Sequence, residues 1–151
     1  MMEISNSQLQ QLANNTIQPG DVYRMKLTSR EGVKPKNDGD TSRNKYFIVM
    51  GVTPDGTLVG FVLINSKINE FISQEARESH YKLLAKDYPF LEKDRYACCG
   101  ELKEIDTITF FQRLQGEVVG CIREEHLDAI RGIIAMAADV SAIKLKDYNI
   151  I

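Results

Sequence analysis

The sequence has few of the features that mark secreted or membrane proteins. It holds only three cysteines in 151 residues, two of them adjacent, which makes a poor disulfide framework and favours a reducing compartment. No stretch reaches the roughly 18 apolar residues that a membrane-spanning helix needs. Residues 1–15 also lack the cationic start and apolar segment of a signal peptide. We therefore expect a cytoplasmic protein with no membrane partner.

A large excess of charge and a metal-binding pattern are also missing. The net charge is −2, so nucleic-acid binding would have to depend on a local basic patch. His80 and His126 show no metal-ligand spacing, and no CxxC pair occurs. Cys98 and Cys99 are neighbours, whose side chains point to opposite faces of a strand, so we expect them to be core residues. The sequence predicts no metal site and no cofactor.

Alternating apolar residues and turn residues predict an antiparallel sheet. Val22–Leu27 alternates apolar with basic residues, as a half-buried strand does, and Lys45–Val52 is a nearly continuous apolar run typical of a strand buried on both faces. Thr53–Gly56 has the sequence TPDG, which favours a tight turn into a return strand at Thr57–Ile64. Gly60, within that strand, indicates a bend or a close approach of another segment.

The remaining segments predict a small mainly β domain with two helices. Residues 1–17 are polar and are expected to form an arm or a short helix, and residues 18–151 a single domain. Thr28–Asn44 lacks apolar periodicity and predicts a long loop, and loops of this length are often functional. The later expected elements are a helix from about Ser73 to Ala85, a strand Arg95–Ile105 with a bulge at Gly100, a helical turn near Asp106, a short strand Glu117–Val119, a helix within residues 123–140 and a tail that adds an edge strand or packs on a partner.

One segment carries a recognisable signature. Residues 100–106, GELKEID, follow an apolar run and end on Ile105 and Asp106. This resembles the PemK/MazF family, in which a core strand runs into (D/E)-Q-(I/P)-R-T-I-D; Glu101 matches the glutamine and Lys103 the arginine. The segments QPGDVYRMKL, RNKYFIVMG and VLINSK, and residues 110–130, are similar to other family segments in the same order. The similarity spans roughly residues 18–136.

The resemblance implies a fold, an activity and partners. The family fold is an SH3-like barrel, usually a homodimer, and its members are toxins of toxin–antitoxin systems. They are hydrolases of the endoribonuclease type that cut single-stranded RNA without a metal, by attack of the 2′-hydroxyl, and a cognate antitoxin protein holds them inactive. Such cleavage needs a proton acceptor, a proton donor and a cation for the phosphorane charge. By alignment with the family, the catalytic candidates are Lys45, Arg43, Asn65 and Ser66, and the candidates for contacts with the RNA backbone are Lys34, Lys36 and Lys67.

Two departures from the family pattern leave a second reading open. Some members carry an arginine and an aspartate at the positions of Cys98 and Gly100. A catalytically silent PemK-like barrel would instead bind a protein or RNA partner through Thr28–Asn44. A third possibility is an unrelated small β-barrel with another ligand. Leu127, Ile130 and Ile134 share one helix face that we expect to be core, and the neighbouring apolar residues allow a dimer contact as an alternative.

Overall fold

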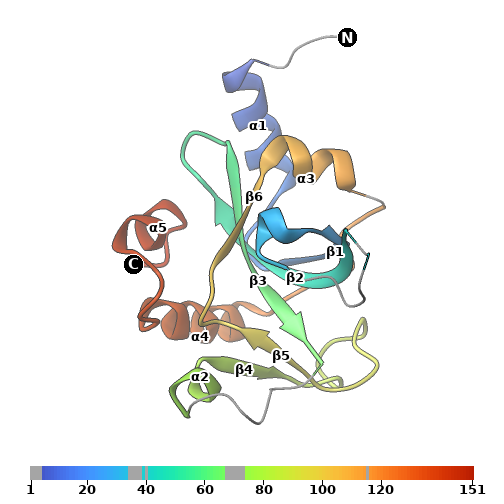
Figure 1. The fold of residues 1–151 in the computed structure, drawn as a ribbon, viewed down its shortest axis with the longest axis vertical. Coiled ribbons are helices and arrows are strands. Elements are labelled where there is room, and N and C mark those ends of the chain that lie inside the picture. The colour runs from blue at the N-terminus through green and yellow to red at the C-terminus, as the bar shows by residue number, and fades with distance from the viewer. Residues whose placement is uncertain (1–4, 34–38, 40, 67–73, 115) are drawn as a thin grey trace.

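The protein is mainly β, as the sequence predicts. A computed structural model describes residues 5–33, 39, 41–66, 74–114 and 116–151. Its strands form one antiparallel sheet in the order β4-β5-β3-β2-β1-β7, with β6 also paired to β3, and the sheet curls into a half-barrel (Figure 1). The elements in chain order are α1 (Asn6–Thr16), β1 (Asp21–Leu27), a 3-10 turn (Ser29–Glu31), β2 (Arg43–Val52), β3 (Leu58–Asn65), α2 (Gln74–Glu78), β4 (His80–Leu83), β5 (Arg95–Cys98), β6 (Lys103–Asp106), α3 (Thr107–Arg113), β7 (Gly120–Cys121), α4 (Glu124–Ala135) and α5 (Ala142–Asp147).

The hairpin of β2 and β3 forms the centre of the sheet. Gly56 closes the turn between them with a φ of 77°, and its N–H donates to the Thr53 carbonyl at 2.8 Å. Residues of β2 alternate between two separate cores, so the strand is buried on both faces as predicted. The first three predicted strands are therefore confirmed.

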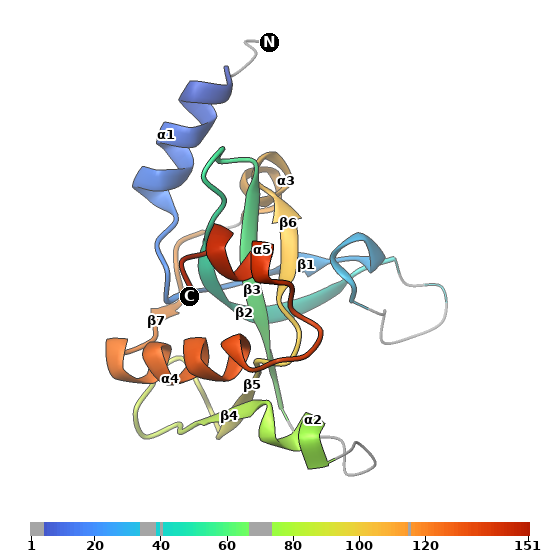
Figure 2. The same ribbon diagram turned by 90° about the vertical axis from the view of Figure 1, so that its left-hand side faces the viewer.

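Helices cover both faces of the sheet and complete these two cores. On one face, α4 and α5 pack against β2 and β3 (Figure 2), and Leu127, Ile130 and Ile134 are buried there as predicted. On the other face, Ala13 of α1 and Phe110 of α3 share the second core with the strands. Of the two alternatives predicted for residues 1–17, an arm or a short helix, the structure shows the helix, and the predicted C-terminal helix is also present. Among the described residues, no helix is both long and apolar enough to cross a bilayer.

The C-terminal tail packs on its own chain, so the expectation of an edge strand is wrong. It forms α5, which presents Tyr148 to the sheet at Gly60. A Cβ on Gly60 would lie 2.6 Å from Cζ of Tyr148, so the close approach predicted at this glycine is confirmed. The Tyr148 hydroxyl donates to Glu104 Oε2 at 2.6 Å, and Lys144 pairs with Glu104 at 3.1 Å. Burial of this ring against the bare backbone at Gly60, together with the bond to Glu104, holds α5 on the sheet.

The predicted helix from about Ser73 to Ala85 is wrong in its second half. Ser73 lies outside the described residues, and α2 ends at Glu78. His80–Leu83 forms β4 instead, in antiparallel register with β5. This pairing satisfies the backbone groups along the outer edge of β5. A helix at this position would leave those groups without a ladder partner.

Two further strand predictions need correction. The strand expected at Arg95–Ile105 is split into β5 and β6, because β5 pairs with Ile64–Asn65 and β6 pairs with the distant end of β3, Leu58–Phe61. Gly100 therefore lies in a connecting turn, not in a bulge. The short strand expected at Glu117–Val119 lies further along the chain, at β7. The two residues of β7, Gly120 and Cys121, pair with Val22 and Asp21 at the start of β1.

Candidate functional site

Strand register brings two of the predicted site residues together. Tyr46 pairs with Ile64 across β2 and β3, so the next residues outward, Lys45 and Asn65, face each other at the open end of the hairpin. The Lys45 Nζ donates to the Asn65 Oδ1 at 2.8 Å, and both side chains are half-buried. The structure thus places these two candidates in direct contact. Their catalytic roles stay predictions.

The environment of Lys45 disfavours its positive charge. Burial, followed by the charges of Arg43 and Arg95, lowers the pKa of Lys45 to about 8. Burial raises the pKa of the Cys98 thiol, so this neighbour is protonated and uncharged at neutral pH. Near pH 8 a substantial fraction of Lys45 is therefore a neutral amine, which can accept a proton.

Of the other predicted site residues, the structure describes Arg43 and Ser66. Arg43 is the first residue of β2, is exposed, and shares a sheet face with Lys45 by strand alternation. Ser66 is exposed directly after β3. Lys34, Lys36 and Lys67 lie outside the described residues. The structure therefore brings Arg43, Lys45 and Asn65 to one end of the hairpin, with Ser66 next in the chain.

Sequence reasoning missed three residues at the same end. Arg24 of β1 and Arg95 of β5 each place their guanidinium carbon 5.7 Å from the ring centroid of Tyr46. Arg95 also supplies a positive charge to Lys45 from the strand in which the family resemblance places an arginine at Cys98. The sequence shows that Arg24 occupies a polar position of an alternating strand. It does not show that Tyr46 and Arg95 lie beside Arg24, because that depends on the order of the strands in the sheet.

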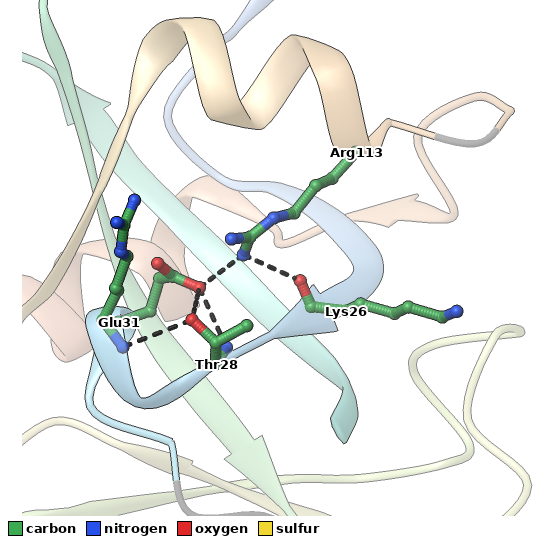
Figure 3. A network of polar contacts seen from close by, with 5 residues as sticks. Lys26, Thr28, Glu31 and Arg113 are labelled. Carbon is green, nitrogen blue, oxygen red and sulfur yellow. Dashed lines mark hydrogen bonds and ion pairs between the residues drawn. The ribbon is translucent and has the colours of Figure 1, made fainter. Parts of the chain in front are cut away.

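A buried polar network fixes the chain as it leaves β1. Arg113 reaches from α3 to Glu31, and its Nη1 also donates to the Lys26 carbonyl at 3.1 Å (Figure 3). The Glu31 Oε1 accepts from the N–H of Thr28 at 2.9 Å and from its hydroxyl at 3.1 Å. Lys103 of β6 donates to the Gly32 carbonyl at 3.0 Å. These bonds anchor the first part of the predicted loop Thr28–Asn44 to α3 and β6.

Among the described residues, no group of three or more His, Cys, Asp or Glu side chains is arranged to hold a metal ion. The sequence matches no protein-family model and no curated protein.

Proposed function

We propose that the chain binds single-stranded RNA at the end of the β2–β3 hairpin and cleaves it by attack of a 2′-hydroxyl on the adjacent phosphorus. The observation that carries this proposal is the hydrogen bond of 2.8 Å between Lys45 and Asn65, with Arg43 beside them. A lysine held by an amide among arginines suits an RNA phosphodiester, which brings an anion together with the exchangeable proton of the adjacent 2′-hydroxyl.

Each residue has a specific part in the proposed reaction. Neutral Lys45 takes the proton of the 2′-hydroxyl, the new P–O bond closes a 2′,3′-cyclic phosphate, and the bond to the 5′-oxygen breaks. The leaving 5′-oxygen takes a proton from water. Arg43 stabilises the negative charge of the phosphorane, and Asn65 holds Lys45 in place. Ser66 positions the scissile phosphate, and Lys34, Lys36 and Lys67 contact the RNA backbone.

The biological setting in this proposal follows from the family resemblance. The chain would be the toxin of a toxin–antitoxin pair, act in the cytoplasm, and be inhibited by a cognate antitoxin protein. A homodimer is part of the same proposal. Its candidate surface is the outer side of α4, where Met136 is 86% exposed and borders a groove with Ala129, Gly132 and Ile133.

The test is cleavage of end-labelled single-stranded RNA by the purified protein in EDTA. We expect cleavage by the native protein, with a rate that rises with pH up to about pH 8, because the neutral form of Lys45 is the base. The double variant Lys45→Ala/Arg43→Ala should be inactive, whereas Lys146→Gln, which removes one exposed charge from α5, should be unaffected. Full cleavage by the double variant would contradict this site assignment.

A second candidate function is a silent barrel that binds RNA or protein without cleaving. The specific observation in its favour is Cys98, which stands where some family members carry arginine and whose half-buried thiol is uncharged. This candidate predicts that the protein captures its partner yet leaves RNA intact and does not arrest growth when expressed. Growth arrest that depends on Lys45 would exclude it.

A further inference from the structure

On the sheet face opposite Lys45, two arginines share one aromatic ring. Strand alternation places Tyr46 on the face of Ile48 and Met50, and Arg24, its partner in β1, points to the same face. Arg95 approaches from β5, next to Tyr96, which pairs with Asn65. Each guanidinium carbon lies 5.7 Å from the centroid of the Tyr46 ring, within the range of a cation–π contact.

The positive charge of this group is not neutralised within the part of the chain that the structure describes. Neither Arg24 nor Arg95 has a carboxylate within ion-pair distance there. The Nε of Arg95 is buried without a hydrogen-bond partner. Two like charges against one ring repel each other, and a bound anion would remove that repulsion and supply acceptors for the free donors.

The surroundings hold the group in place and leave room beside it. The ring centroids of Phe90 and Tyr46 are 6.1 Å apart. Phe90 also packs on Gly120, because a Cβ on Gly120 would lie only 2.4 Å from Cδ1 of Phe90. Arg24 also lines a cavity of about 490 Å³ along the outer edge of β1, together with Lys26 and Asn44 and with Glu117 as its acidic residue. An anion can therefore reach Arg24 from solvent.

We propose that Arg24 and Arg95, positioned by Tyr46, form a second phosphate subsite for single-stranded RNA, which binds a backbone phosphate next to the one held at Lys45. This inference rests on the proposed function, since the two sites lie on neighbouring residues of β2 and one strand of RNA would pass around the end of the sheet between them. RNA is favoured over other phosphorylated partners because single-stranded nucleic acid follows basic surfaces that also carry aromatic rings, here Tyr46 and Phe90. Bidentate guanidinium–phosphate pairs give such a subsite its geometry.

The test is the affinity for a short single-stranded RNA with 2′-O-methyl riboses, which binds but cannot react by this route. Arg24→Gln and Arg95→Gln should each weaken binding about tenfold at low salt. Each should also reduce the slope of log Kd against log salt by about 0.7, the value for one lost phosphate on a single strand. Tyr46→Leu should weaken binding while Tyr46→Phe, which keeps the ring, should not. The control Lys146→Gln removes the same charge from a distant helix and should bind as the native protein does.

The outcomes separate this inference from the proposed function. If the arginine variants, shown to be folded by circular dichroism, bind and cleave like Lys146→Gln, the subsite is wrong and the site at Lys45 stands. If the variants bind weakly but the native protein does not cleave unmodified RNA, the subsite stands and the proposed cleavage falls. If the native protein binds no single-stranded RNA, or binds a phosphopeptide of equal charge as tightly, the inference is overturned.

Discussion

The buried pair of Glu31 and Arg113 provides a quantitative test of what anchors the segment after β1. The Glu31 side chain is 5% exposed and accepts three hydrogen bonds, from Arg113 and from two groups of Thr28. Glu31→Ala leaves the guanidinium and the Thr28 N–H without this acceptor. Removing one partner of a buried ion pair costs about 3–5 kcal/mol. Because the Arg113 side chain is 24% exposed and water can reach it, we expect the lower end, about 3 kcal/mol.

The assay is urea unfolding followed by circular dichroism, with a thermal scan beside it. For a chain of this length, a loss of about 3 kcal/mol corresponds to a fall in Tm of about 6–12 °C. The matched control is Lys82→Met, which removes one partner of an exposed pair with Asp94 at 3.9 Å and should cost less than about 1 kcal/mol. The double variant Glu31→Leu/Arg113→Met should recover part of the loss, because no unpaired charge is left buried. A cost for Glu31→Ala no larger than that for Lys82→Met would refute this reasoning.

Three other predictions concern the site and the tail. The pKa of Lys45 is lowered to about 8, so a pH titration followed by the NMR shift of the Asn65 side-chain amide should have its midpoint near pH 8. A midpoint near the usual 10.5 would contradict the burial of Lys45. Since the folded state loses this proton first, the free energy of unfolding of the native protein should rise relative to Lys45→Met between about pH 8 and about pH 10.5. Gly60→Ala should lower the free energy of unfolding by about 1–3 kcal/mol, because the added Cβ meets the Tyr148 ring. Gly132→Ala, in an open helical position, should raise it by up to about 1 kcal/mol, and equal effects of the two variants would exclude the clash. Tyr148→Phe should cost about 1.5–3 kcal/mol in urea unfolding through the lost bond to Glu104, and an unchanged midpoint would show that this bond contributes nothing.

The sequence predicts the local half of this structure well. The TPDG turn and the apolar runs on either side define the β2–β3 hairpin. The pairing of Lys45 with Asn65 also depends on a register shift between Val49 and Gly51, without which Lys45 would lie opposite Ser66. Gly60 could likewise be identified as a point of close approach, although its partner Tyr148 could not.

What the sequence does not predict depends on pairing between distant segments. His80–Leu83 has residues compatible with a helix, and it becomes a strand because β5 lies beside it. The predicted strand is interrupted between Cys98 and Lys103 because β5 and β6 pair with opposite ends of β3. For the same reason the group of Arg24, Tyr46 and Arg95 could not be found from local patterns, since its members come from three strands.

The most direct test of the central claim is an NMR titration of the native protein with the 2′-O-methyl single-stranded RNA. If the end of the β2–β3 hairpin is the binding site, the signals of Lys45 and of the Asn65 side-chain amide should shift and reach saturation with the same Kd that direct binding gives. Saturable binding that leaves both signals unchanged would contradict the claim.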